Sequence, residues 1–282
     1  MFLSLTSRLS EQNPATQGGH RLNLIFIGDI VGRPGRRAVK TVLPELIETY
    51  DPCAIIANGE NAAGGVGLTQ ETAEELFDLG ITVLTTGNHV WQKKEFYRFL
   101  EDAPNVLRPA NYPPGAPGKG STVVALENGI RLGVVNLIGR VFMSPLDCPF
   151  RVADSIVTEL SDKCDLIVVD FHAEATSEKI ALGWFLDGRV ACVVGTHTHV
   201  QTADERILPE GTGYISDLGM TGPINSVLGV KTDIIIDRFL TGLPKRFLIA
   251  SGPAELCGAV VTVDDCTGKT KAILRIREAA LD

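Results

Sequence analysis

The stretch NLIFIGDIVGRPGRRAVKTVLPELIETYDPCAIIANGE, residues 23–60, decides the fold. It begins with an apolar run over 23–29, continues with apolar residues at helical spacing over 35–50, and ends with a second apolar run over 53–60. Short apolar runs bounded by glycine are typical of buried strands, and a helix between two such runs lets them pair in parallel. The stretch therefore predicts a β-α-β unit, in which ligands are expected at the carboxyl ends of the strands.

The same alternation extends through the chain and predicts an α/β protein. The further predicted elements are helices over 69–80, 151–161 and 177–188 and from about residue 93, strands over 81–89, 165–172 and 189–195, and two strands within 122–138. Late strands over 213–219, 256–263 and 271–276 predict a second sheet, mixed or antiparallel. The sequence has no internal repeat and no long linker. We therefore expect residues 22–282 to form one domain behind a flexible extension, residues 1–21.

Composition narrows the function classes. The chain carries 26 Lys plus Arg against 34 Asp plus Glu, a formal net charge of −8, and it has no long basic run. This balance disfavours a polymeric nucleic-acid partner, since such binding depends on neutralising phosphates, but it allows a small anionic substrate. The six cysteines include no C-x-x-C pair, which favours reduced thiols in a cytoplasmic protein. No apolar run reaches the ~18 residues of a membrane span, so no membrane partner is expected. The sequence allows a homo-oligomer but does not decide the oligomeric state.

Two histidines directly follow the apolar run that ends at residue 195. In VVGTHTHVQ, His197 and His199 are two residues apart, so an extended backbone would point both imidazoles to the same side. Neutral imidazole is a common metal ligand. When the pair is considered alone, the alternative is equally good: both histidines are loop residues whose hydrogen bonds are satisfied.

The other predicted strands also end in polar residues, and together they favour a metal site. These residues are Asp29, Glu60, Asn61, Asn88, His89 and His172. Each of these residues, taken singly, also has a purely structural explanation. Asp29 or Asn88 could be a helix cap or a turn residue, and Glu60 or His172 could be a buried polar group whose hydrogen bonds are satisfied. Taken together with the histidine pair, these carboxylate, carboxamide and imidazole groups suit two divalent ions such as Fe, Mn, Zn or Co.

Six motifs carry a resemblance to a known family. They are GDIVGRPGR, GENAAGGVGLT, TTGNHVW, VDFHAEATSEKIALGWFLDGRV, GTHTHVQTADERILP and YISDLGMTGP. With these motifs, nearly everything from Asn23 onward resembles the YmdB-like branch of the calcineurin-like metallophosphoesterases. The resemblance implies a sandwich of two mixed β-sheets flanked by helices, a dinuclear metal site, and phosphodiesterase activity on 2′,3′-cyclic nucleotides such as 2′,3′-cAMP.

The resemblance also implies a ligand set. Asp29 and His199 would bind one ion, Asn88, His172 and His197 would bind the other, and Glu60 would bridge the two. The broader superfamily usually has Asp-x-His at its first motif and a bridging Asp, whereas this chain has Asp29-Ile30-Val31 and Glu60. The departure fits the YmdB-like branch and removes one imidazole. Two transition-metal ions are therefore expected, with iron favoured and manganese next.

The implied mechanism is in-line attack on the phosphodiester by a hydroxide that bridges the two ions. His89, which follows Asn88, is the candidate acid that protonates the leaving oxygen, and the alternative is that it only hydrogen-bonds the phosphate. Asn61 is expected to contact phosphate or to orient Glu60. Any of three further acids could steady the imidazoles, and the sequence does not choose among them: Asp170, Asp204 and Asp217.

Two other functions fit the same residues. A phosphomonoesterase, such as a nucleotidase, would use the same ions, so the site residues do not separate it from a phosphodiesterase. A regulatory protein that binds a nucleotide and turns it over slowly is a third hypothesis, from a different class.

Overall fold

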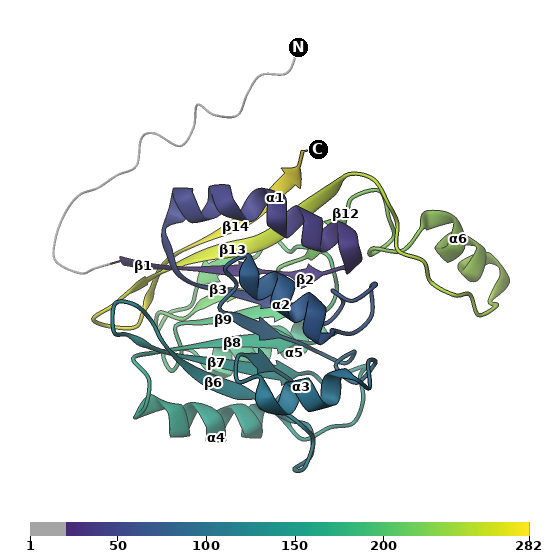
Figure 1. Ribbon diagram of the computed structural model, residues 1–282. Helices are drawn as coiled ribbons and strands as arrows, with labels where there is room; N and C mark the ends of the chain where they lie inside the picture. Colours follow the sequence, from purple (N-terminus) through teal and green to yellow (C-terminus); the bar gives the residue numbers. More distant parts are fainter. Residues whose placement is uncertain (1–20, 282) are drawn as a thin grey trace.

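The structure is a computed structural model in which residues 21–281 are described (Figure 1). The predicted extension, residues 1–21, lies outside the described residues except for Arg21, which begins the first strand. Within residues 21–281, no helix is both long enough and apolar enough to cross a membrane. The predicted cytoplasmic location stays a prediction.

The first sheet contains the β-α-β unit. Its strands are β1 (Arg21–Ile27), β2 (Asp29–Ile30), β3 (Pro52–Asn58), β4 (Val83–Thr85), β5 (Val106–Leu107), β12 (Met220–Pro223), β13 (Ala254–Asp264) and β14 (Thr270–Ala280). They are arranged in the order β2-β12-β13-β1-β3-β4-β5, with β14 also paired to β13. β1, β3, β4 and β5 are parallel, and β13 runs antiparallel to β1. The sheet is therefore mixed.

The second sheet is mixed as well. Its strands are β6 (Ser121–Ala125), β7 (Arg131–Ile138), β8 (Leu166–His172), β9 (Cys192–Thr196), β10 (Arg206–Ile207) and β11 (Gly213–Ile215), in the order β10-β11-β9-β8-β7-β6. β7, β8, β9 and β11 are parallel, and both edge strands are antiparallel. Two mixed sheets with helices on their outer faces confirm the predicted fold class.

The late strands differ from the prediction of a separate second sheet. β13 and β14 form a long hairpin that joins the first sheet, whereas β11 joins the second sheet in parallel beside β9. Pairing between strands that are far apart in the sequence depends on which edges are open in the folded protein. The alternation of apolar residues, which identified the strands, does not contain that information.

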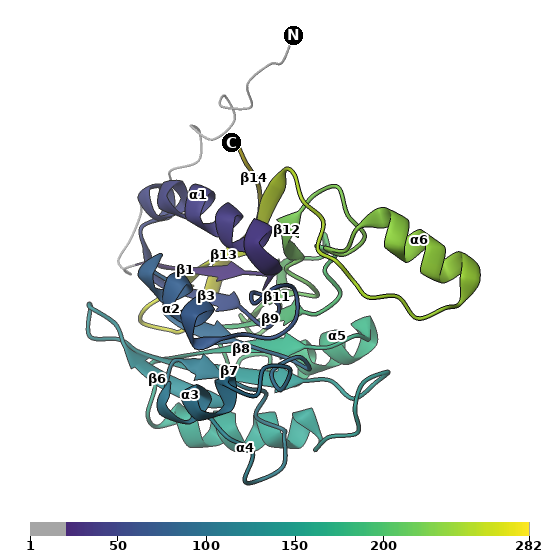
Figure 2. The ribbon, with the colours of Figure 1, turned by 45° about the vertical axis from the view of Figure 1, so that its right-hand side comes forward.

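Five of the six helices in residues 21–281 cover the outer faces of the two sheets. The six are α1 (Gly32–Tyr50), α2 (Gln70–Asp78), α3 (Phe96–Asp102), α4 (Pro149–Ser161), α5 (Thr176–Phe185) and α6 (Thr232–Thr241). Side chains of α1, α2 and α3 pack on the first sheet, and those of α4 and α5 pack on the second. The sequence did not predict α6, which projects away from the body of the molecule in both views (Figures 1 and 2).

The strand alternation of β1 places its side chains in two separate cores. Ile25 and Ile27 face the helix layer, whereas Leu24 and Phe26 face the second sheet, because successive side chains point to opposite faces. All four are at most 1 % exposed, and burying a side chain of this size stabilises the fold by about 1.5–3 kcal/mol. The core between the two sheets brings the carboxyl ends of β3 and β8 together.

Candidate metal centre

The predicted site residues follow strands of both sheets. In the first sheet, Asp29 opens β2, Glu60 and Asn61 follow β3, and Asn88 and His89 follow β4. In the second sheet His172 is the last residue of β8, and the pair His197 and His199 comes directly after β9. Parallel strands present their carboxyl ends at one edge of a sheet, so packing the two sheets face to face gathers these residues at one end of the sandwich.

A buried carboxylate lies on one side of the site. Asp29 is fully buried, and its Oδ2 accepts a hydrogen bond of 3.0 Å from the backbone N–H of His197. Its Oδ1 lies 3.6 Å from His199 Nε2 and 3.9 Å from His172 Nδ1, and it accepts no hydrogen bond from the described residues. A buried carboxylate oxygen that accepts no hydrogen bond is costly, and a bound cation would satisfy it.

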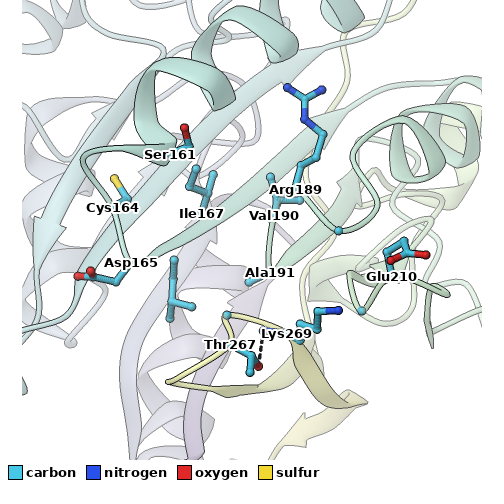
Figure 3. Close-up of a pocket in the computed structure, with 14 residues that line it drawn as sticks. Ser161, Cys164, Asp165, Ile167, Arg189, Val190, Ala191, Glu210, Thr267 and Lys269 are labelled. Atoms are coloured by element: carbon cyan, nitrogen blue, oxygen red, sulfur yellow. Dashed lines mark hydrogen bonds between the residues drawn. The ribbon is translucent and has the colours of Figure 1, made fainter.

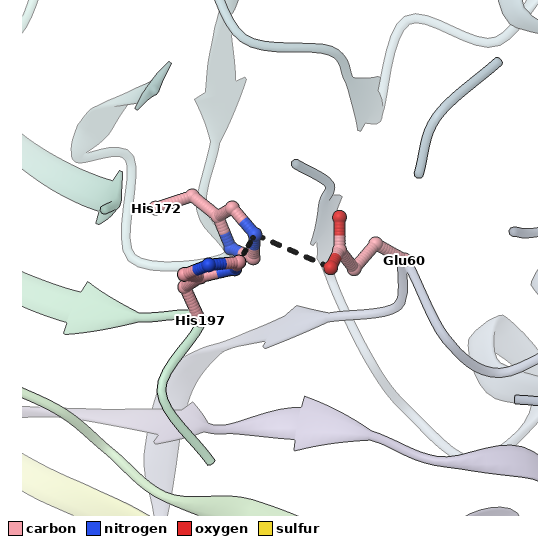
Figure 4. A group of neighbouring side chains, drawn as sticks. All are labelled: Glu60, His172 and His197. Atoms are coloured by element: carbon pink, nitrogen blue, oxygen red, sulfur yellow. Dashed lines mark hydrogen bonds and ion pairs between the residues drawn. The ribbon is translucent and has the colours of Figure 1, made fainter. Parts of the chain in front are cut away.

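Glu60, His172 and His197 form the centre of the site (Figure 4). One ligand atom from each lies within 4.8 Å of the other two. Glu60 Oε1 is 3.2 Å from His172 Nε2, and His197 Nδ1 is 3.0 Å from the same nitrogen. This mixture of a carboxylate and two imidazoles suits Zn, Mn, Fe or Co, so the residues present fit a transition-metal ion.

Asn88 and Gly87, the residue before it, lie beside His172 and Glu60. Asn88 Oδ1 lies 3.1 Å from His172 Nε2. A Cβ atom at Gly87 would lie 2.2 Å from His172 Nε2 and 2.4 Å from Glu60 Oε2, so no side chain fits there. Gly87 was missed in the sequence, where the only signal was its position between a strand and two polar residues.

His89 and Asn61 form a linked pair beside Glu60. The His89 ring Nδ1 is 2.7 Å from Asn61 Oδ1, and the Asn61 amide nitrogen donates to Glu60 Oε1 over 3.2 Å. The backbone N–H of His89 donates to the other oxygen, Glu60 Oε2, over 3.1 Å. Of the two roles predicted for Asn61, orienting Glu60 therefore agrees with the geometry. The His89 side chain remains 33 % exposed, so its ring is accessible to a substrate.

Two of the three candidate supporting acids contact the site, and the third does not. Asp170 accepts a 2.8 Å hydrogen bond from Thr196 Oγ1, and this hydroxyl lies 3.0 Å from His172 Nδ1. These contacts fix the orientation of the His172 ring, whose Nε2 faces Glu60. Asp217 accepts from the backbone and hydroxyl of Thr198, between the paired histidines. Asp204 instead accepts from Ser216. Thr196 was also missed, because a threonine in a strand is unremarkable.

The turn that carries the paired histidines has an unusual backbone. His197 and His199 have φ angles of 101° and 64°, a region that residues other than glycine rarely adopt. The buried Asp217 carboxylate holds this turn and is itself bound by Lys179 Nζ over 2.6 Å. Strained backbone of this kind persists where the surroundings enforce it, and it is common at functional sites.

The charges in the site alter the proton affinity of its members. Burial alone would lower the pKa of His172, but the neighbouring Glu60 carboxylate outweighs burial and raises this pKa to about 9. Burial, together with the charge on His172, lowers the pKa of His197 to about 4. Burial favours the neutral form of Glu60, yet His172 holds its pKa well below the usual range. The site thus combines an ionised carboxylate with a neutral imidazole, both suited to bind a cation.

A separate cavity lies at the opposite end of the strands. It has a volume of about 180 Å³, and Arg189 and Lys269 are among the residues that line it (Figure 3). It is located at the amino ends of β8 and β9, where Leu166 and Ala191 are found. None of the predicted site residues lines this cavity. This cavity is therefore separate from the predicted site, which is identified by the chemistry of its residues.

Comparison with known proteins identifies the family of this chain. The model of the YmdB-like protein family matches residues 25–276. The chain belongs to the YmdB-like family. One relative, from Bacillus subtilis (strain 168), is named 2′,3′-cyclic-nucleotide 2′-phosphodiesterase; it is 53 % identical over 255 residues, which cover 90 % of this chain and 96 % of the relative.

Two solved structures resemble this member of the YmdB-like family along most of its length. A hypothetical protein from Thermus thermophilus has a TM-score of 0.85 and 43 % identity, with 92 % of this chain and 100 % of that chain covered. A protein described as a novel phosphatase from Mycoplasma pneumoniae has a TM-score of 0.88 and 35 % identity, with coverage of 94 % and 96 %. The predicted family is confirmed, whereas the ligand roles of the individual residues stay a prediction.

Proposed function

We propose that this protein is a metal-dependent phosphodiesterase that hydrolyses 2′,3′-cyclic nucleotides, with residues 22–282 acting as one domain. The observation that carries the proposal is the convergence of Glu60, His172 and His197 within 4.8 Å, beside Asp29 Oδ1, which accepts no hydrogen bond from the described residues. The predicted enzyme class, a phosphoric diester hydrolase, is confirmed by the likeness to the Bacillus subtilis enzyme. The substrate is proposed from that enzyme's name.

The proposed metal site would hold two ions, with iron favoured and manganese next. Asp29 and His199 would hold one ion, and Glu60 would bridge to the second. The second ion would be held by Asn88, His172 and His197. When bound, the ions would neutralise charge that develops at phosphorus and generate the attacking nucleophile from water at neutral pH.

The residues around these ligands have separate tasks. His172 is held from behind through Thr196 and Asp170, so its Nε2 is directed toward Glu60. Asn61 fixes His89 through its ring Nδ1, which leaves Nε2 as the atom that would donate a proton to the departing ribose oxygen. Because Asn61 also contacts Glu60, the proposed acid is positioned directly beside the proposed bridge.

The test is hydrolysis by purified protein after addition of iron or manganese. Bis-p-nitrophenyl phosphate and 2′,3′-cAMP are the substrates, and bound metal is measured in the same samples. We expect turnover of both substrates that depends on metal. Metal-replete protein that is inert toward both would refute the proposal, and binding of 2′,3′-cAMP without hydrolysis would favour the regulatory alternative.

A phosphomonoesterase on the same site is the second candidate, because the Mycoplasma pneumoniae protein is described as a phosphatase. The two candidates differ in whether the phosphate carries one or two ester bonds. Comparing rates on 2′,3′-cAMP and 3′-AMP separates them. The proposal requires faster turnover of the cyclic diester.

A further inference from the structure

The loop between β7 and α4, residues 139–148, carries the most exposed aromatic side chain in residues 21–281. This residue is Phe142, which is 90 % exposed. Its φ angle of 61° lies in a region that residues other than glycine rarely adopt, and a bulky side chain there is an outlier. A strained backbone thus holds an apolar ring out in solvent, and strain of this kind is common where a ligand binds.

The loop is attached to the rim of the candidate metal centre. The backbone N–H of Gly139 donates to the carbonyl oxygen of His172 over 3.0 Å, and a Cβ atom added at Gly139 would lie 2.7 Å from Ala173 Cβ. The next residue, Glu174, places its Oε2 3.2 Å from His197 Nε2. Three residues of chain span at most about 11 Å, so Phe142 lies near the residues that surround the proposed ligands.

A buried carboxylate fixes the backbone that leads to Phe142. Glu178, on α5, is 8 % exposed, and its two oxygens accept hydrogen bonds of 3.0 and 3.2 Å from the backbone N–H of Arg140. Its Oε2 also accepts from the backbone N–H of Val141 over 3.2 Å. The proposed hydrolysis does not use Glu178. Its contacts preorganise the turn that displays Phe142, which lowers the entropy cost of binding a ligand there.

Other aromatic residues near the site already pack against one another. Trp91, two residues after His89, lies edge-on to Tyr97 and Tyr112, with ring centres 5.4 and 5.3 Å apart. All three of these rings are half-buried, whereas the Phe142 ring is open to solvent. Phe142 therefore offers the free aromatic face at this rim.

Arg140, two residues before Phe142, adds a cation to this part of the loop. It is exposed, and its guanidinium makes no hydrogen bond or ion pair within residues 21–281. Aromatic rings and guanidinium planes are the side-chain surfaces on which proteins stack unpaired bases. The pair of side chains thus has the chemistry that recognises a nucleotide.

We propose that Phe142 is a specificity-determining residue, on which the nucleobase of the substrate stacks, with Arg140 beside it. The inference rests on the proposed function, in which the phosphate of a 2′,3′-cyclic nucleotide lies at the metal centre. The ribose carries that phosphate on its 2′ and 3′ oxygens and the base on its C1′ atom, so the base extends from the ions toward the rim. Stacking requires only a planar face, so the contact favours the larger purine rings without selecting one purine.

The kinetic test compares a substrate that has a base with one that lacks it. They are 2′,3′-cAMP and methyl riboside 2′,3′-cyclic phosphate, which contain the same cyclic ester. Phe142→Ala should lower kcat/KM on 2′,3′-cAMP by about 5- to 150-fold, mainly through KM, because stacking of one base typically contributes that factor. The substrate without a base should be turned over as by the wild type. Phe142→Tyr keeps a ring and should keep most of the activity.

The matched control is Phe239→Ala. Phe239 is 83 % exposed and lies on α6, outside the loop, so its loss should leave both rates unchanged. Thermal melts of all variants check folding.

A second variant reports the contact without hydrolysis. Phe142→Trp places an indole at the proposed stacking position, and a stacked adenine should quench its emission. Addition of 3′-AMP should therefore quench Phe142→Trp more than it quenches the wild type, whose two tryptophans are the background. Ribose 3-phosphate, which has no base, should not quench the added indole.

Each outcome decides the matter. A loss confined to 2′,3′-cAMP, together with quenching of Phe142→Trp by 3′-AMP, supports the proposal. Unchanged rates in Phe142→Ala, equal losses on both substrates, or an added indole that 3′-AMP does not quench would overturn it. A wild-type protein that hydrolyses neither substrate contradicts the proposed function instead, and quenching alone then decides whether a base stacks on residue 142.

Discussion

The sharpest mechanistic prediction concerns His89→Ala. The His89 ring contacts Asn61 and lies 3.3 Å from Glu60, and its roles as proposed do not include binding an ion. Removing the ring should therefore leave both ions bound while removing the proton donor. General acid catalysis is typically worth ~10² to 10⁴-fold, about 3 to 5 kcal/mol of barrier, and the loss should appear in kcat more than in KM.

The assay compares two leaving groups. A p-nitrophenolate departs well without a proton, whereas a ribose alkoxide needs one. The His89→Ala protein should thus lose far more activity on 2′,3′-cAMP than on bis-p-nitrophenyl phosphate, with unchanged metal content. Asn61→Ala is the matched variant, because it releases the ring without removing it and should give a smaller loss with the same substrate preference. Equal losses of His89→Ala on both substrates would refute the acid role, and lost metal would make His89 a ligand or a structural residue.

Three further predictions concern the ligands. Glu60→Ala should lose more metal than His172→Ala or His197→Ala, because a bridge serves both ions; full occupancy of both ions in Glu60→Ala, measured by elemental analysis, would contradict the bridge. Gly87→Ala should lower metal content and kcat, since its Cβ would lie 2.2 Å from His172 Nε2, whereas Gly59→Ala, whose nearest neighbour would be the Leu84 side chain at 3.3 Å, should be close to wild type. Because the pKa of His172 is raised to about 9, metal must displace its proton, so manganese affinity should increase with pH up to that value and then level off; calorimetry showing no proton release near neutral pH would count against this ligand.

The sequence predicted the parts of the site that depend on local pattern. Strands such as β8 are recognisable because they are mostly apolar, and a polar residue such as His172 at the end of such a run is conspicuous. Parallel order then implies that these strand ends share one edge, so the gathering of Asp29, Glu60 and His172 could be anticipated. The roles of these residues were implied by the family resemblance.

The missed features depend on contacts between distant residues. Thr196 supports His172 only because β8 and β9 pair in register, and Gly87 is required only because a ring from the other sheet packs against it. The attachment of β13 and β14 to the first sheet likewise depends on which sheet edge is free. Helix α6 has exposed apolar residues, such as Phe239, that local pattern does not distinguish from a core helix.

The most direct test of the account is anomalous X-ray scattering from crystals of the metal-loaded protein. The account predicts two peaks about 3.5–4 Å apart on either side of Glu60. One peak should lie at Asp29 and His199, and the other at His172 and His197, with absorption edges that identify iron or manganese. A single peak, or peaks that Glu60 does not contact, would contradict the dinuclear centre.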